Sequence, residues 1–391
     1  MTDLASVLPE DPLREEIGQF ARTHQLAERS RTLDTHPEFP WKEFRAMGDA
    51  GWLGLTLPKE QGGRGLPLRR AAVALQELGY QGGTAFAKLS LQPEFSSVIA
   101  AQGSDALRSR FVLPLAHGEI LVGNQITEPR AGSDLSLLST RVESKGGRLL
   151  LSGTKSQAAF AADAQAAIVY ARSGRAGATG VSAYVVPQDL PGIERRVVED
   201  LGERWMRRGT VTYTSVEISP DQLVGEEGRG LDYLKVELTH ERALLGAIYL
   251  GVARASWEET VREVGDRVVF DGPLSDQEAV AFPLVEDGTR LAATWLYTER
   301  VLDRLDRGER ADDAAAMSKW LAAEVALTTL DHAIQFHGGR GYSKDLPHEQ
   351  RWRDVRSGML AHGTSEVMHR VAARRRWPKA RQPTGRSRTP S

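Results

Sequence analysis

The sequence contains no cysteine among its 391 residues. Disulfide bonds, thiolate nucleophiles and thiolate metal ligands are therefore excluded, and a reducing compartment such as the cytoplasm is favoured. Charge of one sign is also lacking, because 50 Lys and Arg residues balance 52 Asp and Glu residues to a net charge of −2. This balance gives no reason to propose nucleic acid or an anionic membrane as a partner. We predict no metal site.

Long apolar runs are missing as well. No stretch approaches the roughly 20 residues that span a bilayer, and residues 1–4 lack the charged and then apolar layout of a signal peptide. No Gly-x-Gly-x-x-Gly motif leads from a predicted strand into a helix, so a Rossmann domain is not expected. The remaining composition, 41% hydrophobic and 26% charged, is typical of a soluble enzyme with two or three substructures. We expect a cytoplasmic protein.

The spacing of apolar residues changes twice along the chain. Helical spacing up to about residue 118 gives way to short β-branched segments between glycine turns, and it returns after residues 225–230. Strands joined by short turns favour an antiparallel, barrel-like sheet. We therefore predict a multi-domain α+β protein with an N-terminal helical domain (1–118), a central β domain (119–225), a C-terminal four-helix bundle (226–375) and a basic disordered tail (376–391).

The individual elements can be placed from the same periodicity. The predicted helices are 13–27, 41–50, 68–78, 86–116 with a break at Pro93, 231–264, 276–307, 312–336 and 364–375. The predicted strands are 121–127, 140–142, 149–151, 167–171, 181–186 and 211–218. Because ligands favour domain junctions, we expect a cleft where the sheet meets the helices.

Late in the chain lie groups that suit an anionic, ring-bearing ligand. Two glycine turns, 335–342 (QFHGGRGY) and 363–366 (GTSE), flank an Arg353–Asp354 pair. A helix that opens at Thr364 would present free N–H groups to an anion. The sequence therefore predicts a cofactor cradle in this region.

A second polar loop follows the first predicted strand. Residues 125–134 (QITEPRAGSD) place the hydroxyl groups of Thr127 and Ser133 where they could bind a heterocycle or a phosphate. Taken alone, the loop could equally be a strand-end turn in which Asp134 caps the next segment.

These stretches together resemble the signature of the acyl-CoA dehydrogenase family of flavoproteins. Four motifs occur in the family's order, namely residues 58–65 (PKEQGGRG), 127–134 (TEPRAGSD), 267–274 (RVVFDGPL, with aspartate replacing the first glycine) and the C-terminal signature that begins at residue 335. The resemblance covers roughly residues 10–375. It implies helical, β-barrel and helical domains, FAD bound between them, and a homo-oligomer, either a dimer or a tetramer.

The resemblance also implies which residues bind FAD and substrate. FAD would be bound by residues of the β domain and both glycine turns, partly across a subunit interface: Ile126, Thr127, Ser133, Arg267, Phe270, Gln335, Gly338, Gly339, Thr364 and Glu366. Substrate would be bound by Ser133, Arg242 and Gly363. The family usually has a Trp-x-Thr/Ser pair beside the flavin, but Gln157 and Ala159 occupy those positions here. Ala159 removes a hydroxyl group near flavin N5.

The family's catalytic base is the other departure. Most members carry a glutamate immediately before the Gly-Thr turn, where this sequence has His362. Members resembling isovaleryl-CoA and long-chain acyl-CoA dehydrogenases instead place it before an arginine on an earlier helix, which matches Glu241-Arg242.

The helix itself points to the same residue. Glu241 interrupts an otherwise apolar stripe at three-to-four spacing, formed by Leu231, Leu234, Leu238, Leu245, Ile248 and Val252. Burial would raise the pKa of this carboxyl toward the range of a general base. The structural alternative is that Glu241 forms an ion pair with an arginine.

His362 has three open interpretations. Its imidazole could act as a base, it could orient Glu241, or it could fill the space left by the missing carboxylate. We favour the last two. In the family, the backbone N–H of this residue and a flavin hydroxyl group polarise the thioester carbonyl.

The leading hypothesis is an FAD-dependent α,β-dehydrogenase of an acyl thioester. Glu241 would remove the α-proton and the flavin would accept hydride, with coenzyme A or an acyl-carrier protein as the carrier. Electrons would pass to an electron-transfer flavoprotein or to oxygen. The alternatives are a flavin-dependent monooxygenase on the same fold and a non-catalytic relative kept for binding or assembly.

Overall fold

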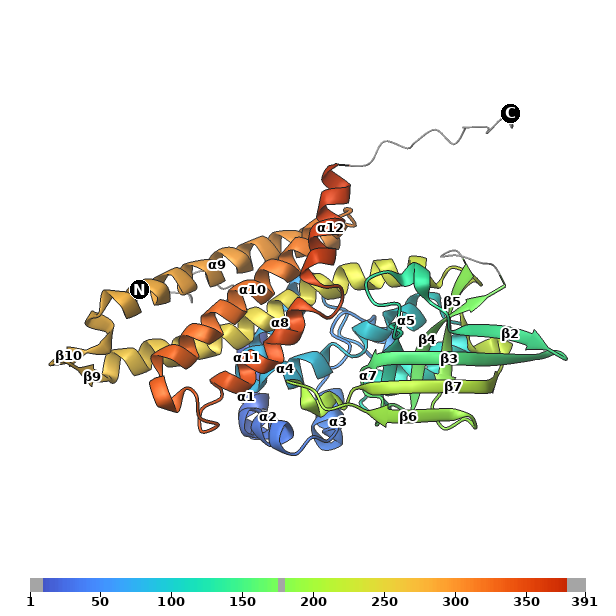
Figure 1. Ribbon diagram of the computed structural model, residues 1–391, viewed down its shortest axis with the longest axis horizontal. Helices are drawn as coiled ribbons and strands as arrows, with labels where there is room; N and C mark the ends of the chain where they lie inside the picture. The colour runs from blue at the N-terminus through green and yellow to red at the C-terminus, as the bar shows by residue number, and fades with distance from the viewer. Residues whose placement is uncertain (1–9, 175–179, 378–391) are drawn as a thin grey trace, which may run out of the picture.

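The computed structural model of this chain describes residues 10–174 and 180–377. A helical N-terminal region is followed by a β-sheet, on the right of Figure 1, and by long helices that extend to the left. This order is the three-part α+β architecture that the sequence predicts. Of the predicted tail, only Arg376 and Trp377 lie within the described residues, and Arg376 is the last residue of a helix.

The N-terminal helices depart from the predicted ones where the chain turns. The predicted helix 13–27 is split, because Gln25 has a φ of 51° between the two pieces. The predicted helix 68–78 instead continues to Ser90 through a kink at Gly83, where φ is 70°. The helices of this region are α1 (Leu13–Thr23), α2 (Leu26–Thr35), α3 (Trp41–Asp49), α4 (Leu68–Ser90), α5 (Ser97–Gln102), α6 (Asp105–Leu107) and α7 (Leu113–Ala116).

The sheet consists of β1 (Val122–Gln125), β2 (Arg141–Lys145), β3 (Arg148–Ala158), β4 (Ala166–Ser173), β5 (Val181–Pro187), β6 (Ile193–Val197), β7 (Gly209–Ile218) and β8 (Leu223–Val224). Its order is β6-β7-β3-β2-β4-β5-β8, with β1 paired to β4, and this path does not close into a barrel. Most pairings are antiparallel as predicted, but β1 and β2 run parallel to β4. The short turns in the sequence reveal only hairpin neighbours, so these two pairings could not be predicted. Strand β6 was also missed, because most of its residues are exposed and its alternation is weak.

The C-terminal region contains α8 (Gly230–Asp266), α9 (Glu278–Asp306), α10 (Asp312–Phe336), α11 (His348–Arg356) and α12 (Ser365–Arg376), with a small β9–β10 ribbon (Val268–Val269 and Gly272–Pro273) after α8. Glycines let α8 approach α4 closely. A Cβ atom on Gly79 would lie 2.7 Å from the carbonyl oxygen of Ile248, and one on Gly251 would lie 2.0 Å from that of Gln76. Helix α8 therefore runs through the protein interior against α4 and α10, and its start packs on β5.

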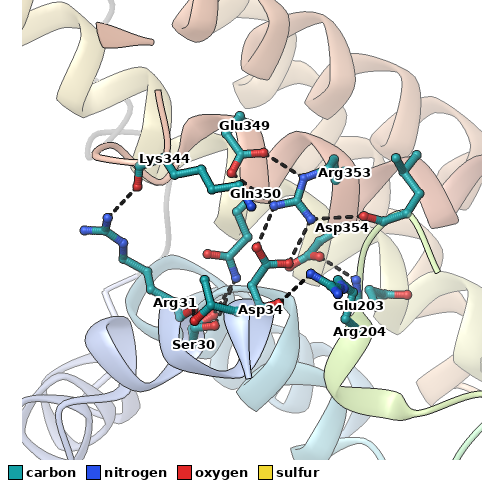
Figure 2. Close-up of polar contacts among 12 residues, drawn as sticks. Ser30, Arg31, Asp34, Glu203, Arg204, Lys344, Glu349, Gln350, Arg353 and Asp354 are labelled. Atoms are coloured by element: carbon teal, nitrogen blue, oxygen red, sulfur yellow. Dashed lines mark hydrogen bonds and ion pairs between the residues drawn. The ribbon is translucent and has the colours of Figure 1, made fainter. Parts of the chain in front are cut away.

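The Arg353–Asp354 pair joins the domains (Figure 2). The Arg353 guanidinium donates to both carboxylate oxygens of Asp34 on α2, at 2.8 and 2.7 Å, and to Glu349 at 2.7 Å. Asp354 accepts hydrogen bonds from the backbone N–H of Glu203 at 2.6 Å and from the hydroxyl group of Thr84 at 3.1 Å. The expectation that this pair belongs to the cofactor cradle is therefore wrong, because its polar atoms connect α11 to α2, α4 and the sheet domain.

We predict that Arg353→Met will destabilise the protein. The Asp34 side chain is only 5% exposed, and removing one partner of such a pair leaves a buried charge, which costs about 3–5 kcal/mol. The measurement is the free energy of unfolding in urea. The double variant Asp34→Leu, Arg353→Met should lose less unfolding free energy than the two single variants lose in sum. The control is Arg262→Met, on an exposed position of α8. Its unfolding free energy should stay within about 0.5 kcal/mol of the wild type. If Arg353→Met lowered the unfolding free energy no more than Arg262→Met does, the role of Arg353 in joining the domains would be contradicted.

Candidate active site

Glu241 lies in the first third of α8 and is buried between the domains. The residue is 2% exposed, although it is ionisable. Its Oε2 atom lies 3.4 Å from Nε2 of His362, whose ring stacks on Phe95 with ring centroids 5.2 Å apart. The two residues that the sequence offers as catalytic are thus in contact, although they are more than a hundred positions apart.

Two further glutamates surround Glu241, and the sequence reading missed both. Glu237 lies one turn earlier on α8 and accepts a hydrogen bond from Asn124 Nδ2 at 3.0 Å. Glu94, in the 3-10 turn η3 (Glu94–Ser96), accepts hydrogen bonds from the N–H and hydroxyl groups of Thr56 at 3.0 and 3.1 Å. The i, i+4 spacing of Glu237 and Glu241 was the available signal, but nothing in the sequence brings Glu94 to them.

Desolvation is the main reason why the pKa values of these carboxyl groups are raised. It raises the pKa of Glu241 to about 8, and the nearby charge of Glu94 adds to the rise. Burial and the repulsion of Glu241 raise the pKa of Glu237 well above its ordinary value. Because each carboxyl group affects the ionisation of the other, the pair titrates together. The resting site is therefore partly protonated near neutral pH.

The turn that carries His362 has an unusual backbone. His362 has a φ of 54° and Gly363 a φ of 99°. Arg242 Nε donates to the carbonyl oxygen of His362 at 3.0 Å, and Lys319 Nζ donates to that of Gly363 at 2.8 Å. A Cβ atom on Gly363 would lie 2.5 Å from Met368. The positive φ at position 363 favours glycine, and two basic side chains hold the turn against α8 and α10.

His362 is electrically neutral in this setting. Desolvation, together with the charges of Lys88, Lys319 and Arg242, lowers its pKa well below the ordinary value. Its backbone N–H forms no hydrogen bond with any described residue. The side chain is thus a weak proton acceptor, while the main chain offers a free donor beside the Glu241 carboxylate.

Lys319 is a further buried group that the sequence did not single out. Burial lowers its pKa to about 7, with Arg242 and Lys88 as further causes. The polar atoms around the turn are thus desolvated as a group.

A buried ion pair anchors the loop that follows β1. Lys155 Nζ donates to Glu128 and to the carbonyl oxygen of Ile126, both at 2.9 Å. Burial opposes ionisation of Glu128, but Lys155 and the donors of Ser139 and Thr140 prevail and lower its pKa to about 2. The loop is thereby fixed to β3.

The residues of this loop and of β3 that were expected to contact FAD are exposed or half-buried. The carbonyl oxygen of Thr127 accepts from the Ser156 N–H at 2.8 Å, and Ser133 is exposed. Gln157 is exposed at a β-bulge with a φ of 55°, and Ala159 follows the end of the strand. The side chain of Asp134 accepts from the Ser136 N–H at 3.0 Å, as the capping interpretation predicts.

The second group of expected FAD contacts is not brought to Glu241. Arg267 and Phe270 lie at the β9–β10 ribbon, at the left end of Figure 1, whereas the sheet lies at the right. Phe270 is 91% exposed, and the Arg267 guanidinium lies 3.5 Å from the Cβ position of Gly338. Gln335, Gly338 and Gly339 are exposed nearby, with open space around Gly339.

Thr364 and Glu366 stand at the beginning of α12. The hydroxyl group of Thr364 caps the helix by accepting from the Val367 N–H at 3.4 Å. Within residues 10–174 and 180–377, no cluster of acidic or histidine side chains suits a metal ion, and no helix is long and apolar enough to cross a membrane.

Comparison with known proteins gives the family. Family models for the acyl-CoA dehydrogenase N-terminal, middle and C-terminal domains match residues 10–119, 123–216 and 228–376. The chain is 30% identical over 344 residues to a 3-(aryl)acrylate reductase of Clostridium sporogenes, covering 87% of this chain and 91% of that protein. It is also 30% identical to the mitochondrial short-chain specific acyl-CoA dehydrogenase of Homo sapiens, covering 87% and 84%.

A solved structure agrees with these sequence matches. The complex of glutaryl-coenzyme A dehydrogenase with glutaryl-CoA superposes with a TM-score of 0.87 at 26% identity, covering 96% of this chain and 95% of that one. The chain belongs to the acyl-CoA dehydrogenase family.

We predict that Glu241→Gln will change how stability depends on pH. The pKa of Glu241 is higher in the folded protein than in the unfolded chain, so unfolding releases a proton between pH of about 4.3 and about 8. Wild-type stability should therefore fall relative to the variant across this range, by up to about 1.4 kcal/mol per pH unit. Urea unfolding from pH 5 to 8 measures it, with the exposed Glu278→Gln as the control. If the difference in unfolding free energy between Glu241→Gln and the wild type did not change with pH, the raised pKa of Glu241 would be contradicted.

Proposed function

We propose that this protein is an FAD-dependent dehydrogenase of acyl thioesters in which Glu241 removes the α-proton. One observation supports this assignment above all. The carboxyl group of Glu241 is desolvated, has a pKa near 8 and lies beside a turn whose backbone N–H is free. A proton acceptor next to a donor for the carbonyl oxygen is what thioester α-deprotonation requires.

The chain's own groups divide the work as follows. Glu241 takes the α-proton once it is ionised, while the N–H of His362 donates to the thioester oxygen as negative charge grows there. Arg242 and Lys319 keep that N–H in place by binding the carbonyl groups of the turn. The neutral imidazole packs between Phe95 and Glu241. FAD, when bound, supplies the acceptor for the β-hydrogen as hydride.

The exposed groups fit FAD in two places. Next to the active site, Ile126, Thr127 and Ser133 on one side and Thr364 and Glu366 on the other provide polar atoms for the flavin and its ribityl chain. At the β9–β10 ribbon, the forked guanidinium of Arg267 beside the open Gly338–Gly339 turn suits a diphosphate. Gln335 and the exposed ring of Phe270 would contact the adenosine.

The separation of these two groups supports a homo-oligomer. The ribbon and the sheet lie at opposite ends of the chain, so the ribbon of a second copy would complete each site, as a dimer or a tetramer. The thioester carrier is a pantetheine derivative, either coenzyme A or an acyl-carrier protein. We further propose a cytoplasmic location and an electron-transfer flavoprotein or oxygen as the acceptor.

Gln157 and Ala159 support a second candidate, a flavin monooxygenase on the same fold. The missing hydroxyl group at Ala159 removes one expected donor near N5, where oxygen chemistry is controlled. Consumption of oxygen with hydroxylation of a substrate, in the presence of a flavin reductase, would favour this candidate.

We predict that Glu241→Gln will abolish anaerobic bleaching of the flavin by acyl thioesters. Loss of a general base lowers the rate by about 10²- to 10⁴-fold, whereas His362→Ala should retain most activity because the backbone donor remains. Stopped-flow absorbance with a panel of acyl-coenzyme A and acyl-carrier thioesters measures both variants. Bleaching by Glu241→Gln at the wild-type rate would show that the base lies elsewhere.

The rate of flavin reduction should also depend on pH. Only ionised Glu241 can accept a proton, so the rate at low substrate concentration should rise with pH and level off above about 8. The rate for Glu241→Asp should also rise with pH, but to a lower maximum. A wild-type rate that is flat from pH 6 to 9 would contradict the assignment.

A further inference from the structure

Three glutamates meet at the active site, and α-proton removal uses only one of them. Glu94, Glu237 and Glu241 are 6%, 3% and 2% exposed. They come from η3 and α8, which are far apart in sequence. A buried carboxyl group without a partner costs several kcal/mol, so the two additional acids need an explanation.

Each additional acid has one oxygen atom that binds nothing. Thr56 occupies Oε1 of Glu94 and Asn124 occupies Oε1 of Glu237, but the buried Oε2 atoms have no hydrogen-bond donor among the described residues. Within the same residues, neither acid forms an ion pair with lysine or arginine. In the free protein the raised pKa values of Glu237 and Glu241 keep this pair partly protonated, which limits the repulsion.

A tyrosine on the sheet points into the same place. Tyr170 on β4 is fully buried, and its hydroxyl group has no partner among the described residues. Burial raises its pKa, and the nearby charges of Glu237 and Glu241 raise it further. The phenol oxygen therefore lies close to these carboxyl groups without binding to them.

The unpartnered atoms flank the proton-transfer site. Phe95, adjacent to Glu94, stacks on His362. Asn124 donates to the carbonyl oxygen of Phe95 at 3.2 Å as well as to Glu237. An acyl group whose α-carbon faces Glu241 would thus have Glu94 and Glu237 beside it. An unsubstituted alkyl chain would leave both oxygens without donors, which sites of this kind reject strongly.

We propose that the acyl group carries a protonated amine, which Glu94 and Glu237 bind next to Glu241. This inference rests on the proposed thioester dehydrogenase. An ammonium or iminium group supplies both positive charge and several N–H donors, so it matches two carboxylates better than a single hydroxyl group does. No set of side chains among the described residues suits a metal ion instead.

The test compares isosteric acyl groups that differ in one atom. Prolyl and cyclopentanecarbonyl pantetheine thioesters form one pair, and 4-aminobutanoyl and pentanoyl pantetheine thioesters form the other. Binding is measured by calorimetry on FAD-loaded Glu241→Gln, which the proposed mechanism leaves unable to react. The amine should bind at least about tenfold more tightly than its carbon analogue in one pair, as expected for a hydrogen bond between charged groups.

A second substitution identifies the acid. Adding Glu94→Gln keeps the shape of the side chain but removes its charge, so most of the preference should disappear, while the control Glu278→Gln should keep it. Equal or weaker binding of both amines, or a preference unaffected by Glu94→Gln, would overturn the proposal.

Wild-type bleaching separates the two ideas. If the protein oxidises the carbon analogues and shows no preference, the amine site is wrong and the dehydrogenase stands. If it binds amines selectively but oxidises none of the four thioesters, the amine site stands and the proposed reaction is wrong for these acyl groups.

Discussion

The burial of the Glu241 carboxyl group on α8 is the constraint that organises this protein. Charge on Glu241 is unfavourable there, because the carboxyl group is desolvated and the nearby charge of Glu94 repels it. Raised pKa values keep Glu237 and Glu241 partly protonated near neutral pH, and residue 362 is a neutral imidazole instead of a cation. A carboxyl group whose pKa lies near neutral pH is also well suited, once ionised, to accept a proton there.

The fold keeps this site dry by closing three domains around α8. Glycines at 79 and 251 allow α4 and α8 to touch along their backbones. The Arg353–Asp354 pair fixes α11 to the N-terminal helices and to the sheet domain (Figure 2). At the turn after residue 361, Arg242 and Lys319 donate to carbonyl groups, and the charge of Arg242 partly offsets the desolvation of Glu241. Domain packing and the acid–base chemistry are therefore parts of one arrangement.

Sequence patterns revealed much of this, because periodicity and motifs are local. The stripe on α8 singled out Glu241, and the order of helices and strands predicted the three-part fold. What remained hidden depends on contacts between distant segments: Glu94 beside Glu237, the parallel pairing of β1 and β2 with β4, and Asp34 opposite Arg353. Charged residues in strand β6 and a short, highly charged α11 also masked their own periodicity.

The central claim is that Glu241 exchanges protons with the α-carbon of a thioester. A thioester with sulfur in place of the β-carbon has no transferable β-hydrogen, so proton transfer can be observed alone. Incubation in D₂O followed by mass spectrometry of the recovered thioester measures α-hydrogen exchange. We expect exchange with the wild type and with His362→Ala, but only the uncatalysed background with Glu241→Gln. Exchange by Glu241→Gln at the wild-type rate would contradict the account.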